Sequence, residues 1–549
     1  MPNVSLWNSK RGTASSSAGA IHQLVPRLAW GDAVGNQVRY LRNLLRGWGY
    51  ASEIYAEQWD EACRDEVRPA LDYARDAGRD TALLVHHSFE SRLVPLVAKA
   101  KGRKALLYHN VTPERFFEGT DRHVARGCML AREELLQLRE HVTHAWAYSH
   151  FSVEELSAAG YPDASVLPFA VDWNAFNVPP DAALREQVED GCANVLFVGR
   201  TVPSKRLEDV LRVFTAYQRL YQPKSRLLVA GTLYSSAPYD ASVLALREQL
   251  GPDRVVFLGR VDAAQLSACF ASATAYLSMS RHEGFGVPLL EAMYRGVPVV
   301  AYGAAAVPET MGGAGLTTLS DDPAQVAGLL AVLERDPALR SRVVEAQRQR
   351  LASLDQQSVA QRVREALMPF LQGDASPARP PAAPTVTVVC PGFDAAPDAP
   401  MSQLARAVVD RLPDASLWTV RRQVMPLQLA PSDERDGVTR VRRFTPDEPC
   451  FGLDGVSPPS SSSLETGVRC APGPLLFAGA GEEVARRTVS RLPPDTRVAG
   501  IWEPRRAPDA GVKQVLGKRL WELTPGHDLT SLAAELAREL DVGGRPHAR

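Results

Sequence analysis

The segment that most directly indicates the fold is RHEGFGVPLLEAM, residues 281–293, in which two glutamates bracket a glycine-rich turn. Apolar runs flank it, Ala275–Leu277 upstream and Val297–Val300 downstream. This pattern predicts a strand, a loop, a short helix and a second strand. Pro288 suits the first turn of that helix, because its missing N–H has no partner to lose there.

The turn before this predicted helix is typical of an anion-binding site. The free N–H groups of a helix N-terminus and the helix dipole both favour negative charge. Gly284 and Gly286 let the backbone approach a ligand closely, while Glu283 lies in the loop and Glu291 about one turn into the helix. The backbone of this segment can hold a diphosphate, and its two carboxylates can hold two sets of hydroxyls. A nucleotide-sugar has these parts. Ordinary α/β architecture, with no ligand, is the alternative interpretation.

A second candidate site follows the apolar run Asn194–Val198, which predicts a buried strand ending at Gly199. Three cations come next: Arg200, Lys205 and Arg206. Ligands of open α/β sheets bind outside the carboxyl ends of the strands. There Arg200 offers phosphate oxygens a planar fork and Lys205 a mobile point charge. A solvated basic turn is the alternative.

Taken together, these motifs resemble the donor site of retaining glycosyltransferases of family 4, which have the GT-B fold. The resemblance covers about residues 20–372. It rests on Gly199-Arg200 with Lys205, on Glu283-Gly284-Phe285-Gly286 with Glu291, on a hinge-like segment at 166–172, and on later strands at 228–231 and 256–259.

The resemblance implies an α/β protein in which two Rossmann-like domains face each other across a cleft. We expect a flexible lead-in over residues 1–19 and an acceptor domain over 20–175. The donor domain is expected over 176–372, ending in a helix that returns to the first half. A proline-rich linker at 373–384 leads to an accessory α/β region at 385–549, which resembles half of a Rossmann-like unit.

Individual roles follow from the resemblance. Glu283 is expected to contact the hydroxyls of the donor sugar and Glu291 the ribose; the sequence leaves open whether Glu283 is also a nucleophile. Arg200 and Lys205 are expected to stabilise negative charge on the departing diphosphate. The remaining donor-pocket residues are Gly199, Gly284, Phe285, Gly286 and Val287.

The first half supplies further candidates. His109 follows the apolar run 105–108 and matches a family position that faces the donor sugar, although a loop histidine with an ordinary hydrogen bond is the alternative. His86 and His87 end another run and are weaker candidates. Ser152-Val153-Glu154-Glu155 predicts a capping box at the start of a helix.

The loop at residues 31–36 is a candidate for contact with the donor phosphates and the acceptor, again by resemblance. Its candidate residues are Gly31, Asp32, Gly35 and Asn36. The alternative is a simple helix N-terminal turn in which Asp32 or Asn36 caps the helix.

Composition narrows the class of protein. The formal net charge of -1 over 549 residues gives no indication of nucleic-acid binding. The seven cysteines form no Cys-x-x-Cys pair, and no Asp-x-Asp motif is present, so we expect neither a metal nor a cofactor. Because no long apolar segment occurs near the N-terminus, we expect a cytoplasmic protein that can associate peripherally with the inner face of the membrane.

These observations predict a retaining glycosyltransferase. It would move a hexose, with mannose as the first expectation, from a nucleotide-sugar to a glycan or lipid-linked acceptor in bacterial surface polysaccharide assembly. Two alternatives stay open. One is another GT-B enzyme, such as a phosphorylase or a nucleotide-sugar epimerase. The other is a non-catalytic nucleotide-sugar-binding or scaffold protein.

Overall fold

The structure is a computed structural model. It describes residues 19–78, 80–233, 237–373, 386–394, 396–412, 415–420, 432–436, 439–444, 461–471, 474–479, 498–502, 520–522 and 528–540, with the single residues 485, 492 and 496. The predicted lead-in (except residue 19) and the predicted linker (except residue 373) lie outside the described residues. None of the described helices is both long enough and apolar enough to cross a membrane.

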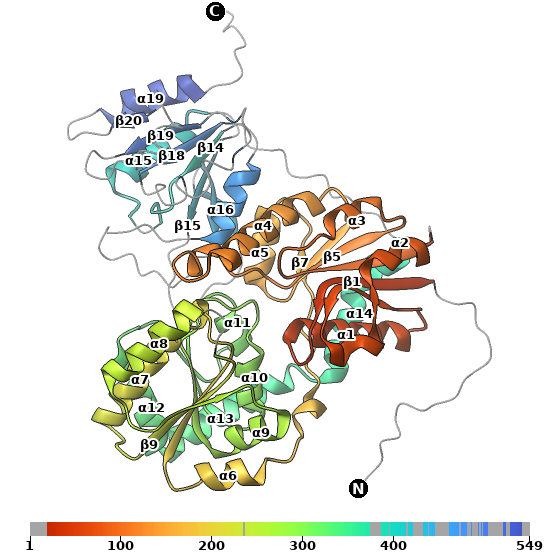
Figure 1. The fold of residues 1–549 in the computed structure, drawn as a ribbon. Helices are drawn as coiled ribbons and strands as arrows, with labels where there is room; N and C mark the ends of the chain where they lie inside the picture. Colours follow the sequence, from red (N-terminus) through yellow and green to blue (C-terminus); the bar gives the residue numbers. More distant parts are fainter. Residues whose placement is uncertain are drawn as a thin grey trace, which may run out of the picture.

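The first domain is a parallel seven-stranded sheet in the order β3-β2-β1-β4-β5-β6-β7. Its helices lie on both faces of the sheet (Figure 1). The elements are β1 (Ala20–Leu28), α1 (Ala33–Gly47), β2 (Ile54–Trp59), β3 (Val67–Pro69), α2 (Tyr73–Asp76), β4 (Thr81–His87), α3 (Val94–Lys99), β5 (Lys104–Tyr108), α4 (Arg122–Leu138), β6 (His144–Ala147), α5 (His150–Ala158) and β7 (Ser165–Val166).

The second domain is a parallel six-stranded sheet in the order β10-β9-β8-β11-β12-β13. Its elements are α6 (Ala182–Val188), β8 (Ala193–Val198), α7 (Leu207–Leu220), β9 (Ser225–Ala230), α8 (Ala237–Leu250), β10 (Val255–Gly259), α9 (Ala263–Ser272), β11 (Ala273–Ser278), α10 (Val287–Tyr294), β12 (Val299–Tyr302), α11 (Val307–Met311), β13 (Leu316–Thr318), α12 (Pro323–Arg335), α13 (Pro337–Ala352) and α14 (Gln356–Gln372).

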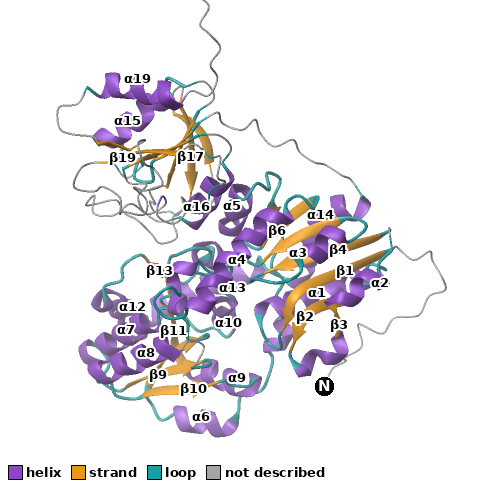
Figure 2. Ribbon diagram, turned by 45° about the horizontal axis from the view of Figure 1, so that its top comes forward, coloured by secondary structure: helices purple, strands orange, loops and turns teal. Residues whose placement is uncertain are grey.

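Interior strands of both sheets are buried on both faces. Every residue of β4 and of β9 is buried, as expected for parallel strands that are covered by helices on each side (Figure 2). The predicted α/β class with two facing Rossmann-like domains is confirmed.

The third region contains more structure than the half unit expected from the sequence. Its described strands form a seven-stranded sheet, in the order β16-β17-β15-β14-β18-β19-β20, that is parallel except for β16. Its parallel strands repeat the 3-2-1-4-5-6 order of a full doubly wound sheet. The elements are β14 (Thr387–Val389), α15 (Pro400–Val409), β15 (Ser416–Val420), β16 (Ser432–Asp436), β17 (Thr439–Phe444), α16 (Ser462–Cys470), β18 (Leu475–Ala478), β19 (Val498–Trp502), β20 (Leu520–Glu522) and α19 (Leu529–Leu540).

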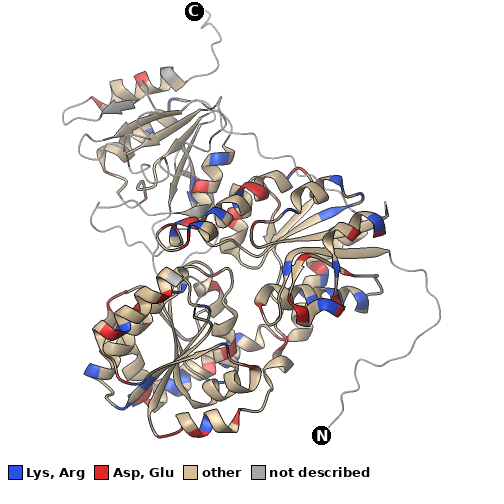
Figure 3. Ribbon diagram, in the orientation of Figure 1, with Lys and Arg blue, Asp and Glu red and all other residues tan. Residues whose placement is uncertain are grey.

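The third domain packs on α4 and α5 of the first domain through α16 (Figures 1 and 2). Ala158 of α5 belongs to the same apolar cluster as Trp418 and Phe444 of the third sheet. The Arg469 guanidinium lies 3.0 Å from the Glu133 carboxylate, and Arg442 donates a 3.0 Å hydrogen bond to Ser157. Charges of both signs are interspersed over the three domains (Figure 3).

Helix α5 begins earlier than the sequence predicted. Ser149 is its N-cap, and the Ser149 hydroxyl accepts a hydrogen bond from the Ser152 N–H at 3.2 Å. The predicted capping box at Ser152 is therefore wrong. Its glutamate is used elsewhere, because Glu155 forms a buried ion pair with Arg132 at 2.8 Å.

Helix α14 returns the chain from the second domain to the first. Val359, Val363, Leu367 and Phe370 form one buried face, and they share an apolar cluster with residues of the first sheet. Phe370 packs edge-on against Trp146 of β6, with ring centroids 6.2 Å apart.

We expect Phe370→Ala to lower the free energy of unfolding by about 3–5 kcal/mol, because it removes a buried aromatic ring and leaves a cavity. Urea unfolding followed by tryptophan fluorescence measures this change, and Trp146 lies beside the site. Glu365→Ala, on the exposed face of the same helix, should change stability by less than about 0.5 kcal/mol. Equal effects of the two variants would contradict the packing described for α14.

Candidate active site

A cleft of ≈ 1730 Å³ lies between the first and second domains. The carboxyl ends of β1, β4 and β5 supply one wall, and the loops after β8 and β11 supply the other, as expected for ligand sites of parallel sheets. The lining residues that the sequence had singled out are Asp32, His109, Arg200, Lys205, Glu283, Gly284, Phe285, Gly286 and Val287.

The wall formed by the second domain contains the predicted glycine-rich turn. Gly286 is the N-cap of α10 and has φ +100°, a conformation that side chains other than glycine rarely adopt. Pro288 lies in the first turn, as predicted. The start of α10, including Val287, lines the cleft. A negatively charged ligand is favoured there by the helix dipole.

Lys205 and Glu283 meet in this wall although they are far apart in sequence. Lys205 Nζ lies 2.5 Å from Glu283 Oε1, and the two side chains are 21% and 12% exposed. The partly buried pair fixes the carboxylate beside the cationic end of Lys205. Arg200 is exposed at the cleft. Burial raises the pKa of Asp32 on the first-domain wall, and the positive charge of Arg200 partly opposes that rise.

Arg206, the third predicted cation of this cluster, is not among the lining residues of the cleft. It lies in the left-handed region at φ +54° and forms ion pairs with Glu208 at 2.9 Å and Asp209 at 2.8 Å. The basic run therefore divides into two cations at the cleft and one that stabilises the start of α7.

His109 lies on the opposite wall, directly after β5. Its Nε2 is 2.8 Å from Nδ1 of His86, and burial lowers the pKa of His109 to about 3. His109 is therefore neutral at physiological pH. It can exchange hydrogen bonds with a ligand without carrying charge.

The two walls touch through loop residues that the sequence did not indicate as partners. Asn110 has φ +69°, and its side-chain oxygen lies 2.7 Å from Nε2 of His282. The Ser149 hydroxyl donates to the Gly284 carbonyl at 3.0 Å. A Cβ at Gly284 would lie 2.9 Å from Cβ of Asn110, so only glycine allows this approach.

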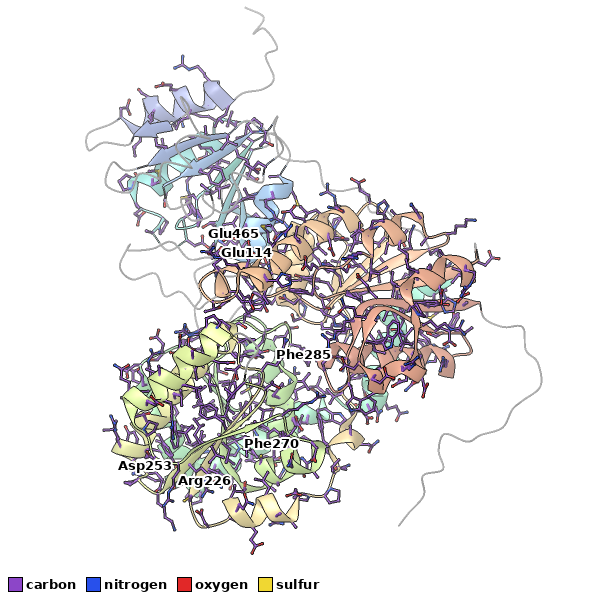
Figure 4. All side chains as sticks on the ribbon, in the orientation of Figure 1. Glu114, Arg226, Asp253, Phe270, Phe285 and Glu465 are labelled. Atoms are coloured by element: carbon purple, nitrogen blue, oxygen red, sulfur yellow. The ribbon has the colours of Figure 1, made fainter. Side chains whose placement is uncertain are left out.

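An aromatic pair completes the contact between the halves. Phe285 of the glycine-rich turn stacks on Phe169 of the hinge segment, with ring centroids 4.1 Å apart and an interplanar angle of 12°. Figure 4 shows Phe285 at the side of the second domain that faces the first, far from Arg226 and Asp253 at the amino ends of β9 and β10. The turn is thus held against the first domain by packing as well as by hydrogen bonds.

The loop at residues 31–36 forms the start of α1. The Asp32 side chain caps the helix by accepting from the Gly35 N–H at 2.6 Å, and Gly31 has φ +76°. Among the four predicted residues Asp32 lines the cleft, whereas Gly31, Gly35 and Asn36 do not. Burial raises the pKa of Asp32. Asp32 is therefore the helix cap that the sequence offered as one interpretation, and contact of this loop with donor phosphates or an acceptor stays a prediction.

Glu291 and Gly199 lie behind the wall and are not lining residues of the cleft. Glu291 is 9% exposed, and burial raises its pKa to about 7, an effect that Arg295 partly opposes. Within the described residues, no group of three or more His, Cys, Asp and Glu side chains has an arrangement that could hold a metal ion.

Residues 185–350 match the family model of glycosyl transferases group 1. This range contains the second-domain wall of the cleft, with Arg200, Lys205 and Glu283, and also Gly199 and Glu291, which lie behind that wall. The second domain is therefore similar in sequence to group 1 glycosyltransferases.

Curated proteins named as glycogen synthase or as glycosyltransferases are also similar in sequence to this chain. Glycogen synthase of Mycobacterium tuberculosis (strain CDC 1551 / Oshkosh) is 29% identical over 229 residues, which is 41% of this chain and 53% of that protein. D-inositol 3-phosphate glycosyltransferase of Acidothermus cellulolyticus is 31% identical over 37% of this chain and 47% of its own length. This chain thus spans about half the length of these two relatives. A GDP-mannose-dependent alpha-(1-6)-phosphatidylinositol monomannoside mannosyltransferase of Mycobacterium tuberculosis is 26% identical over 50% of this chain and 77% of its own length.

Solved structures share the fold. Anabaena Alr3699/HepE in complex with UDP and glucose aligns with a TM-score of 0.51 and 17% identity, over 64% of this chain and 99% of that chain. Sucrose-phosphate synthase (tll1590) from Thermosynechococcus elongatus aligns with a TM-score of 0.52 and 16% identity, over 65% and 100%. These alignments support the GT-B fold.

Glu291→Gln should stabilise the protein at pH 8 and leave it nearly unchanged at pH 4.5. A folded-state pKa of about 7, above the ordinary 4.5, means that the folded protein favours the neutral carboxyl. That preference contributes most to the free energy of unfolding at low pH. The contribution is lost as pH rises through about 7, which lowers the free energy of unfolding by about 3 kcal/mol.

Melting temperatures of wild type and Glu291→Gln between pH 4.5 and 8 measure this effect. We expect the difference between the two proteins to open as pH rises. Glu345→Gln, a glutamate whose side chain is 56% exposed on α13, is the matched control. A constant difference across this pH range would contradict the burial of an ionisable Glu291.

Proposed function

We propose that this protein is a retaining glycosyltransferase of family 4 that moves a sugar from a nucleotide-sugar to a glycan or lipid-linked acceptor. The observation that carries the proposal is one cleft in which Arg200, Lys205 and the start of α10 face His109 of the other domain. Cations and helix N–H groups suit the diphosphate of such a donor. The similarity of residues 185–350 to group 1 glycosyltransferases supports the same reading.

The proposed reaction follows from charge. Transfer of the sugar breaks the sugar–phosphate bond and forms a bond from the anomeric carbon to an acceptor hydroxyl oxygen, whose proton passes to the departing diphosphate. Arg200, Lys205 and the N–H groups at the start of α10 stabilise the negative charge that develops on the diphosphate. Glu283, held by Lys205 at 2.5 Å, binds hydroxyls of the donor sugar. No metal or cofactor is assigned a step, and the nucleotide-sugar is a substrate.

Contacts between the two walls would help the cleft to exclude water during the proposed reaction. Asn110 with His282, Ser149 with Gly284, and Phe169 with Phe285 bring the glycine-rich turn against the first domain. A closed cleft excludes water and so limits hydrolysis of the donor. The first domain would then present the acceptor, from the part of the cleft beyond His109.

The finer assignments are also proposals. We propose a hexosyl donor, with mannose first, a role in bacterial surface polysaccharide assembly, and a cytoplasmic location at the inner face of the membrane. The similar mannosyltransferase of Mycobacterium tuberculosis acts, by its name, with GDP-mannose on a phosphatidylinositol monomannoside. This supports mannose and a lipid-linked acceptor.

A non-catalytic nucleotide-sugar-binding or scaffold protein is the second candidate. The Lys205–Glu283 ion pair favours it, because two groups assigned to the ligand satisfy each other at 2.5 Å. Both candidates require the nucleotide to bind, so only turnover distinguishes them.

We expect one nucleotide family among UDP, GDP and ADP, with its sugars, to raise the melting temperature of the wild type. A ligand that binds only the folded state stabilises it by about 2.7 kcal/mol at a hundredfold excess over Kd. Arg200→Ala should weaken this shift by removing a cation of the cleft that can bind the diphosphate, whereas Glu345→Gln should keep it. The absence of a shift at millimolar concentrations of all three families would contradict the proposed function.

Arg200→Ala and Lys205→Ala should each lower kcat by about a hundredfold to a thousandfold, the usual cost of losing one group that stabilises developing negative charge. Arg348→Ala, whose side chain is 68% exposed on α13, should keep the wild-type rate. The assay measures release of nucleoside diphosphate with the donor identified by the melting experiment. Nucleotide binding without turnover in the wild type would favour the scaffold protein instead.

A further inference from the structure

A row of three hydrogen-bonded side chains runs behind the cleft, from β1 through β4 to the end of β5. Nε2 of His86 lies 2.9 Å from Oε1 of Gln23, and Nδ1 of His86 lies 2.8 Å from Nε2 of His109. Gln23 is 0% exposed and His86 is 1% exposed. His109, the last member, lines the cleft.

The first member fixes the direction of every hydrogen bond in the row. The Gln23 amide nitrogen donates to the backbone carbonyl of Val38 in α1 at 3.0 Å. A carbonyl oxygen only accepts, so the amide N–H must point toward Val38 and the amide oxygen toward His86. That oxygen can only accept as well, and therefore Nε2 of His86 carries a proton.

Both imidazoles are neutral, so each has a single N–H. Burial lowers the pKa of His86 well below its usual range and that of His109 to about 3, and in each case a second histidine lowers it further: His109 for His86, and His87 for His109. With its proton on Nε2, His86 has an unprotonated Nδ1 that accepts. Nε2 of His109 must then be the donor, which leaves Nδ1 of His109 without a proton.

We propose that Gln23 and His86 are positioning residues, which lock His109 in the Nε2–H form so that its Nδ1 accepts a hydrogen bond from a hydroxyl of the donor sugar. Among the described residues, none hydrogen-bonds to this Nδ1. The choice of sugar partner rests on the proposed function; the proton positions do not. A site that expects a hydroxyl donor should discriminate against a deoxy-sugar at that position.

The row also joins two parts of the cleft. Its first hydrogen bond ends on α1, whose N-terminus is capped by Asp32 at the cleft. His109, at the other end, precedes Asn110, which contacts His282 of the second domain. Substitution of Gln23 at the first end of the row is therefore expected to change the protonation of His109 at the cleft.

The test is nuclear magnetic resonance of the protein labelled with ¹⁵N in its histidine rings, at neutral pH, with the His109 signals assigned by comparison with His109→Asn. We expect a protonated Nε2 and an unprotonated Nδ1 in the wild type. Gln23→Leu removes the acceptor that fixes His86, so the His109 proton should redistribute between its two nitrogens. A wild-type His109 with its proton on Nδ1, or an unchanged tautomer in Gln23→Leu, would overturn the proposal.

Gln347→Leu is the matched control. Gln347 is also 0% exposed, and it makes two buried backbone hydrogen bonds, with Val297 at 2.9 Å and Val299 at 3.0 Å, away from the cleft. This variant loses comparable contacts and should leave the His109 signals unchanged. A redistribution in Gln347→Leu as well would assign the effect to general loosening and overturn the role of Gln23.

Kinetics supply the second measurement. Gln23→Leu should lower kcat/KM for the nucleotide-sugar about tenfold, while the affinity for the free nucleotide, which lacks the sugar, stays within about twofold. An unchanged kcat/KM would overturn the link to the sugar. If the wild type turns over no nucleotide-sugar at all, the proposed function fails, and the tautomer measurement still decides whether Gln23 and His86 lock His109.

Discussion

The return of α14 to the first sheet is the constraint on which the candidate site depends. The chain leaves the first domain at the hinge near Phe169, builds the second sheet, and comes back through a helix. Val359, Val363, Leu367 and Phe370 of this helix are buried in an apolar cluster that includes residues of both sheets. With both ends of the second domain attached, the carboxyl ends of the two sheets face one cleft. The contacts of Asn110 and Ser149 with the glycine-rich turn are then short local interactions, added to an arrangement that apolar packing already provides.

Helix α5 connects this site to the third domain. Its N-cap Ser149 donates to Gly284, and His150 binds Glu309 of the second domain at 2.8 Å. Ala158, at its other end, is part of the core that the third domain builds around Trp418 and Phe444. One helix of nine residues is thus in contact with all three domains. Its position is restrained from both ends.

Much of the fold could be predicted from the sequence because it depends on local patterns of residues. The strand, glycine-rich turn and helix around Glu283 follow from apolar periodicity and from the preferences of Gly286 and Pro288, and the structure has them where the sequence predicted. The confirmed α/β class follows from the same alternation. The start of α5 was misplaced because Glu155 binds Arg132 rather than the helix N-terminus, and a local pattern contains no information on that competing partner.

The contacts that close the cleft could not be predicted. Asn110 and His282 are 172 positions apart, and Ser149 and Gly284 are 135 apart, so no local pattern pairs them. The sequence also did not predict how the basic run divides. Arg206 and Lys205 are neighbours, yet Arg206 binds Glu208 and Asp209 whereas Lys205 binds Glu283. The roles assigned to Glu283, Glu291, Arg200, Lys205 and His109 remain predictions about a ligand.

We propose that a nucleoside diphosphate binds between the first and second domains. A crystal structure of the full chain with the nucleotide that it binds would show where the diphosphate lies. We expect diphosphate oxygens within about 2.7–3.2 Å of the N–H groups at the start of α10 and of the Arg200 or Lys205 side chain. A nucleotide bound in the third domain, or in the cleft with its diphosphate away from α10, would contradict it.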